Sequence, residues 1–424
     1  MILEKSQTAL DIIGKISGSA SKVGFINDAT LTDALMYLEN IGMPTSKQED
    51  YKYFNADALL KREFKSIEQK FETPSDINEY KLEDTITLVV VNGNYSESLS
   101  DKIILNGLHI TAFSNLSENA KELISSTADV KSDAFVALNT AFCSNGFHLR
   151  VEKNVELQIP IHVVYISDAS SEALVNSRNL IEVEENASAI IIEQQVVCGK
   201  GKVFNNYLSE KFVATNAKLV SYTWQNEGLR GYSVNTNQVD VQAGGHYDNT
   251  TITISGQVVR NNHNVVLSGK NGQAHLNGLF VSGGSQLVDN HTLMDHRVPH
   301  CESNELYKGI VKDKSTGVFN GKIFVRKDAQ KTNAYQSSKN ILLSDDATIN
   351  TKPQLEIYAD DVKCSHGTST GKIDESALFY LNARGIGAES AKSMLLSSFA
   401  IEVIDKIEVD SLKEKIIQAF EKTL

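Results

Sequence analysis

Hydrophobic and polar residues follow three different patterns along the chain. In the first, up to about residue 75, apolar residues recur at three- and four-residue spacing, which is typical of amphipathic helices. The clearest stripe, which Pro74 ends, consists of Leu59, Leu60, Phe64, Ile67 and Phe71. This pattern predicts an N-terminal helical region over residues 1–80.

The second pattern, over residues 81–150, mixes strands and helices. A compact apolar strand, Ile86–Val91, stops at the turn pair Asn92-Gly93. Helices are expected over Glu118–Ser126 and Asp133–Cys143.

The third pattern, over residues 151–371, consists of short alternating apolar segments rich in Val, Ile and Thr. A turn residue, then Ala or Gly, then an apolar strand recurs, and the copies start 30, 28, 27, 45 and 30 residues apart. Such a period without an internal helix indicates a β-solenoid, in which each coil covers the apolar face of the previous one. We assign the step of 45 to an insertion around Asp289–Glu305. A two-sheet sandwich is the alternative architecture. The copies begin at Asn186, Asn216, Gly244, Asn271, Thr316 and Asp346.

Helical periodicity returns over residues 372–424. Asp374 can cap a first helix that Gly385 ends. This C-terminal region should either cap the solenoid or present an apolar stripe to a partner. On the second helix, we expect a common face formed by Ala391, Met394, Leu395, Ser398 and Phe399.

Composition narrows the functional classes. The chain has 424 residues and a net charge of −12, which argues against non-specific binding to nucleic acid or anionic membranes. We find neither an apolar run of membrane-spanning length nor a signal-peptide pattern at Met1, so we expect a cytoplasmic protein. Its four cysteines should then be reduced thiols, and none forms a Cys-x-x-Cys pair.

Two polar clusters are candidates for metal chemistry. If residues 355–367 are extended, Cys364 and His366 share one face and can supply two ligands, too few to close a site. The alternative is a buried thiol beside a strand-end histidine. The second cluster, residues 291–301, contains the secondary candidates His296 and Cys301. On an unbroken strand, His291 and Asp295 share one face and His296 lies on the other. The alternative to a metal site in this cluster is a set of polar residues that hydrogen-bond the turns of a solenoid.

Other functional motifs are weak or absent. Residues 367–373 resemble a phosphate-binding loop but have the wrong spacing, so we predict a turn. A solenoid fold is also compatible with a carbohydrate-active lyase or hydrolase. The best candidate for its catalytic acids is Asp360-Asp361 beside Lys363. Adjacent acids on a strand face opposite ways, and a chain with one Trp is poor for stacking sugars.

Several long motifs together resemble the SufB/SufD family. They are Val318–Ile323, Asp328–Thr332, Asn340–Ser344 and Thr351–His366. Gly367 after Cys-Ser-His, and His291-Thr292-Leu293 with Pro299 and Cys301, are similar to the SufD branch. The resemblance implies a right-handed parallel β-helix between helical ends, in a non-enzymatic scaffold subunit of SUF iron–sulfur cluster assembly.

The resemblance also implies partners and a site. A SufD-like subunit pairs with SufB through the C-terminal end of the β-helix, or with itself in isolation. It binds the ATPase SufC, which holds the ATP, through its C-terminal helices. His366 then corresponds to a ligand at the SufB interface for a transient iron or iron–sulfur cluster, with Cys364 less certain. A purely structural partner is the alternative. The residues expected to bind SufC are Leu378, Phe379, Leu381, Met394, Leu395 and Phe399.

Overall fold

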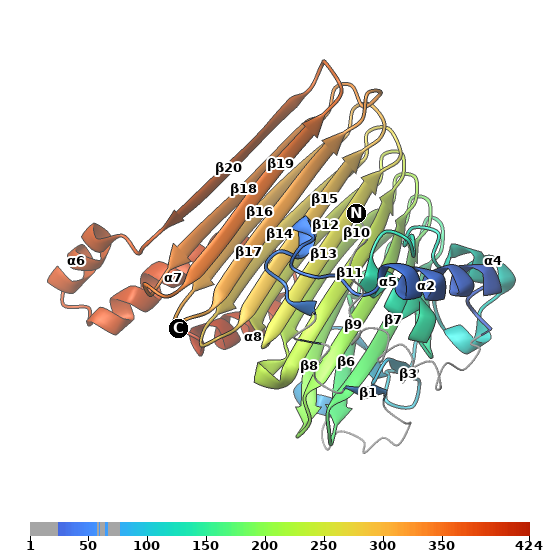
Figure 1. Cartoon of the computed structure of the whole chain (residues 1–424), viewed down its shortest axis with the longest axis horizontal. Coiled ribbons are helices and arrows are strands. Elements are labelled where there is room, and N and C mark those ends of the chain that lie inside the picture. Colours follow the sequence, from blue (N-terminus) through green and yellow to red (C-terminus); the bar gives the residue numbers. More distant parts are fainter. Residues whose placement is uncertain (1–23, 57–58, 60–63, 67–76) are drawn as a thin grey trace.

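The computed structural model describes residues 24–56, 59, 64–66 and 77–424. Two ten-stranded sheets form a parallel β-solenoid of about eight turns, with helices before and after it (Figure 1). This confirms the predicted mainly β solenoid with helical flanks.

Consecutive solenoid strands alternate between the two sheets, which we call sheet A and sheet B. In sheet A the order is β4 Leu108–Ala112, β5 Gly146–Val151, β7 Ala173–Val183, β9 Val203–Val213, β11 Gly231–Val241, β13 Val258–Leu267, β15 Leu287–His296, β17 Thr316–Val325 and β19 Thr348–Ile357, with β1 Lys65–Ser66 paired to β7. In sheet B it is β3 Asn94–Ser96, β2 Ile86–Val91, β6 Ile161–Ala169, β8 Ser188–Gly199, β10 Lys218–Asn226, β12 His246–Ser255, β14 Gln273–Ser282, β16 Glu302–Val311, β18 Asn333–Leu342 and β20 Lys363–Gly371.

A recurring left-handed turn joins the sheet A strands from β5 to β17 to the sheet B strand that follows each of them. One residue in the turn has a φ near +60°, and in most of these turns its backbone N–H donates to a carbonyl in the next coil, as from Asn186 to Thr215 and from His300 to Gln330. The turn residues are Asn154, Asn186, Asn216, Gly244, Asn271, His300 and Lys331. The coils from β5 to β18 therefore each contribute one such turn to the same edge of the solenoid.

The turn series corrects the predicted insertion. His300 lies 29 residues after Asn271, so the period continues through Asp289–Glu305 without interruption. The predicted copy at Thr316 is the start of a sheet A strand, whereas the earlier copies precede sheet B strands. The apparent step of 45 residues arose because it was counted from a copy before a sheet B strand to a copy at the start of a sheet A strand. Residues 367–371, which we predicted as a turn, belong to strand β20.

The helices pack on the outer faces of the sheets. Near the N-terminus, α2 and α5 cover sheet A through Leu38, Phe135 and Phe204. The predicted helix at residues 59–71 is wrong at Lys65–Ser66, which form β1, and its remaining residues lie outside the described ones except Leu59 and Phe64. The helices are α2 Asp28–Ile41, α4 Glu118–Leu123, α5 Ala134–Phe142, α6 Glu375–Ala383, α7 Ala388–Ile404 and α8 Asp410–Glu421, with short 3-10 helices η1 Glu49–Tyr51, η2 Ile77–Glu79, η3 Phe113–Asn115 and η4 Gly228–Arg230.

The C-terminal helices lie along sheet B instead of capping the solenoid. Apolar side chains of α7 and α8, among them Leu396, Val403 and Phe420, pack on the outer face of sheet B. Of the residues predicted to share one face of α7, Ala391 is buried, whereas Met394 is 52% exposed, so the sheet covers only part of that face. Figure 1 shows α6 beyond the end of β20, and none of its residues is buried.

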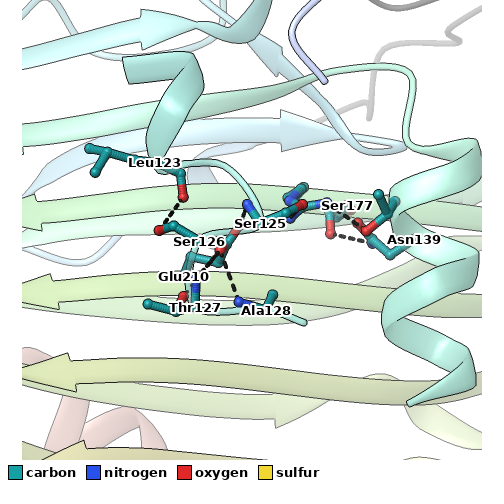
Figure 2. A network of polar contacts seen from close by, with 10 residues as sticks. Leu123, Ser125, Ser126, Thr127, Ala128, Asn139, Ser177 and Glu210 are labelled. Carbon is teal, nitrogen blue, oxygen red and sulfur yellow. Dashed lines mark hydrogen bonds and ion pairs between the residues drawn. The ribbon is translucent and has the colours of Figure 1, made fainter. Parts of the chain in front are cut away.

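A buried carboxylate fixes the segment before α5 on sheet A. Glu210 on β9 accepts hydrogen bonds from the backbone N–H groups of Ser125 and Ala128, at 2.9 and 3.2 Å (Figure 2). It also forms an ion pair of 2.6 Å with Arg178, and both side chains are almost fully buried. One carboxylate thus neutralises a buried cation and orders a loop 82 residues earlier in the chain.

We expect Glu210→Gln to destabilise this region, because it leaves the buried Arg178 guanidinium without an anionic partner. Breaking a buried pair in this way costs about 3–5 kcal/mol. Hydrogen–deuterium exchange should accelerate at the amides of Ser125 to Ala128. Glu185→Gln, which breaks an exposed pair with Lys153, should cost less than about 1 kcal/mol. Unchanged exchange in Glu210→Gln would contradict this assignment.

Candidate functional site

The last coil of the solenoid leaves two sheet edges open within the described part of the chain. β19 is paired only to β17, and β20 only to β18. An edge strand presents unpaired N–H and C=O groups that can pair with another chain. Exposed apolar side chains lie beside these edges, namely Tyr335, Ile357 and Tyr358. This open end has the features of a docking surface.

Cys364 and His366 lie on the inner face of β20. The strand register places Cys364 beside Ala334 and His366 beside Gln336, and both of these neighbours on β18 are buried in the interior. Cys364 is partly buried and packs against the interior core, whereas His366 is exposed. The two predicted ligands therefore share one face, and that face looks into the solenoid at its open end.

The four cysteines are free thiols. Burial raises the pKa of Cys364 above its ordinary value, although a backbone hydrogen bond from Ala334 partly opposes this. Because the thiol keeps its proton at neutral pH, Cys364 needs a metal ion or a cationic partner to become a thiolate ligand.

A buried carboxyl group lies two strands behind His366. Glu305, Gln336 and His366 occupy the same register position on β16, β18 and β20. Glu305 Oε2 accepts hydrogen bonds from Thr292 Oγ1 at 2.6 Å and from Gln336 Nε2 at 3.2 Å. Glu305 and Gln336 could not be recognised from the sequence, because their alignment with His366 depends on a register that links residues about 30 positions apart.

Burial raises the pKa of Glu305 to about 7, against the opposing hydrogen bonds from Thr292 and Gln336. Glu305 Oε1 and Gln336 Oε1 are buried acceptors without a hydrogen-bond partner among the described residues. A proton on Glu305 supplies one more hydrogen-bond donor in a place where these buried acceptors lack one. The in-register residues behind His366 thus include a carboxyl group, that of Glu305, which can gain or lose a proton near neutral pH.

The secondary candidates lie deeper in the interior. His296 Nε2 is 2.9 Å from Ser303 Oγ, and Ser303 is in register with Ala334 and then Cys364. Cys301 is buried against the carbonyl of Gly269. Ser303 is two strands from Cys364, about 10 Å along the solenoid axis, so the structure does not bring His296 together with Cys364.

The remaining candidates lie on the surface. Phe379 on α6 is 74% exposed, and Leu378 and Leu381 beside it are partly buried. On α7, Leu395 and Phe399 are partly buried. The acid considered for carbohydrate chemistry, Asp361, forms an exposed ion pair with Lys331. Among the described residues, no helix is both long and apolar enough to cross a bilayer.

Comparison with known proteins identifies the family of this chain. A family model described as "SUF system FeS cluster assembly, SufBD core domain" matches residues 165–399, and one described as "SufBD protein N-terminal region" matches residues 19–163. The chain therefore belongs to the SufBD family of the SUF system for iron–sulfur cluster assembly.

Within this family the chain is SufD-like. It is 30% identical to the iron–sulfur cluster assembly protein SufD of Escherichia coli over 90% of each chain. It is 27% identical to SufD of Bacillus subtilis over 77% of this chain and 75% of that protein. The Arabidopsis thaliana protein ABCI7, chloroplastic, is 28% identical over 98% of this chain and 89% of its own.

We expect Glu305→Gln to change how stability depends on pH. Between pH 4.5 and about 7 the folded protein holds a proton on Glu305 that the unfolded chain has lost, so the unfolding free energy falls as pH rises through this window. The gap between these two pKa values corresponds to about 3 kcal/mol.

The variant should match the wild type at pH 4.5 and exceed its unfolding free energy by up to about 3 kcal/mol at pH 8. Urea unfolding at both pH values measures this difference. Glu302→Gln, on the outer face of the same strand, should show no pH-dependent difference. A constant offset between Glu305→Gln and the wild type would contradict the interpretation.

Proposed function

We propose that this protein is a non-enzymatic scaffold subunit that pairs with SufB through the open end of the solenoid. The observation that supports this most is the pair of uncovered edge strands, β19 and β20, with Cys364 and His366 on the inner face of β20. An exposed edge made of strands of ten and nine residues favours aggregation unless a partner covers it. A second subunit of the same fold can continue both ladders.

In this proposal, Cys364 and His366 supply part of a site for a transient iron ion or iron–sulfur cluster. Clusters are held mainly by thiolates, and one thiol with one imidazole is an incomplete set. The partner must therefore add the remaining ligands, and this subunit alone binds no cofactor tightly. In isolation, a second copy of the chain can occupy the same edge as a homodimer.

We also propose that α6 and the neighbouring surface of α7 bind SufC. Phe379, Tyr380 and Met394 expose more than half of their side-chain surface. Large exposed apolar residues at one site are typical of protein–protein contacts. In this arrangement, ATP is bound by SufC and not by this chain.

Replacing His366 tests the shared site. We expect His366→Ala to leave stability within about 0.5 kcal/mol, because the side chain is exposed. In the complex reconstituted with SufB and SufC, the cluster yield should fall about tenfold, measured by anaerobic absorption of the iron–sulfur chromophore. His109→Ala, an exposed histidine on β4 at the opposite end of sheet A, is the control. Equal yields in both variants would remove His366 from the site.

Replacing Phe379 tests the second surface. Phe379→Ala should weaken SufC binding at least about tenfold, because it removes a large apolar contact, while pairing with SufB persists. Leu229→Ala, which removes a 64% exposed apolar side chain on η4, should have no effect. Calorimetric titration with SufC measures both. Wild-type affinity in Phe379→Ala would exclude α6 as the contact.

A further inference from the structure

Three side chains on the outer face of sheet B bring two imidazoles and a carboxylate together. His246 and Asp248 are two residues apart on β12, so both point outward, and His275 is in register with Asp248 on β14. Their candidate ligand atoms all lie within 4.8 Å of one another. Each side chain is about one-quarter to one-third exposed, so the group can be reached from solvent.

Asp248 is the centre of this group. Its Oδ2 is 2.7 Å from His246 Nε2, and its Oδ1 is 2.8 Å from His275 Nδ1. The other nitrogen of His246, Nδ1, is 3.1 Å from Gln273 Oε1. A histidine ligand usually donates its second N–H to such an acceptor, which fixes the ring and directs the ligand nitrogen. Gln273 thus orients Nε2 of His246 toward the carboxylate.

The surroundings leave room for further ligands. Asp248 and His275 line a cavity of about 600 Å³ between sheet B and the connection from α7 to α8. Asn277 and Asn304 of sheet B and Glu408 from the α7–α8 connection also line it. The α7–α8 side also contributes Glu402 and Asp405, against Lys406 and Lys339. Because Glu402 is paired with Lys308 and Lys339, and Asp405 with Lys413, the attraction for a cation comes mainly from the Asp248 carboxylate itself.

We infer that His246, Asp248 and His275 bind a divalent transition-metal ion such as Fe²⁺ or Zn²⁺. Two imidazoles with one carboxylate suit these ions, whereas Mg²⁺ and Ca²⁺ prefer oxygen ligands. At metal–ligand bonds of about 2.0–2.2 Å, tetrahedral ligand atoms lie about 3.3 Å apart, so small side-chain rotations suffice. The cavity side provides the open coordination position. This inference is independent of how the open end of the solenoid is used.

The test is metal binding by the full chain under anaerobic conditions. Equilibrium dialysis with Fe²⁺, Zn²⁺ or Mg²⁺, and optical titration with Co²⁺, report affinity and ligand type. We expect one Co²⁺ site without thiolate charge-transfer absorption. His275→Gln and Asp248→Asn should each abolish this site or weaken it at least tenfold. Binding of Fe²⁺ alone identifies a ferrous site, and binding of both Fe²⁺ and Zn²⁺ a less selective transition-metal site.

Two control variants separate this site from the others. His109→Gln changes another exposed histidine paired with a carboxylate, Glu152, and should bind metal as the wild type does. Cys364→Ser changes the open end and should also retain this site. Failure of the wild type to bind Co²⁺, a preference for Mg²⁺, or wild-type affinity in both His275→Gln and Asp248→Asn would overturn the inference. Loss of Co²⁺ binding in Cys364→Ser alone would place the metal at the open end instead.

Discussion

The in-register hydrogen-bond ladder of the two parallel sheets is the constraint on which the structure depends. Each coil satisfies its backbone groups and covers its interior only through the next coil, so both ends need a different solution. At the first end, the ladders finish in the short antiparallel strands β3 and β4, of three and five residues, and edge strands this short offer few unpaired backbone groups. At the other end, no described element continues β19 or β20. The helices that could cap this end pack along sheet B. This asymmetry places the docking edges, together with Cys364 and His366, at one end.

The sequence predicted the fold class because turns and alternating strands are local signals. Asparagine and glycine tolerate a positive φ, so Asn186, Asn216 and Asn271 marked their coils. The predicted series of coils failed at His300 and Lys331, which take the same backbone conformation although neither is a typical turn residue. Stacking on neighbouring coils holds these residues in a conformation that they would rarely adopt alone. Local propensity could not reveal this, because the stabilising contacts come from residues about 30 positions away.

The candidate site, too, could be predicted where it depends on neighbouring residues and could not be predicted where it depends on distant ones. Strand parity alone placed Cys364 and His366 on one face, because side chains alternate along any strand. Glu305 and Gln336 became visible only through the register between coils. The outer group of His246, Asp248 and His275 depends on register too, since His275 comes from a different strand. In a solenoid, a short motif supplies at most half of a site, and the neighbouring coil supplies the rest.

Alternation along sheet B also separates its two candidate metal-binding positions. Cys364 and His366 face the interior, as do Tyr247 and Leu276 on β12 and β14. His246, Asp248 and His275 occupy the intervening positions and face outward, toward the connection between α7 and α8. A single ion cannot bridge the two positions, because the backbone of the sheet lies between them. The outer group can therefore be changed without altering the inner face, and the two positions can differ in metal preference, since one offers a thiol and the other only nitrogen and oxygen.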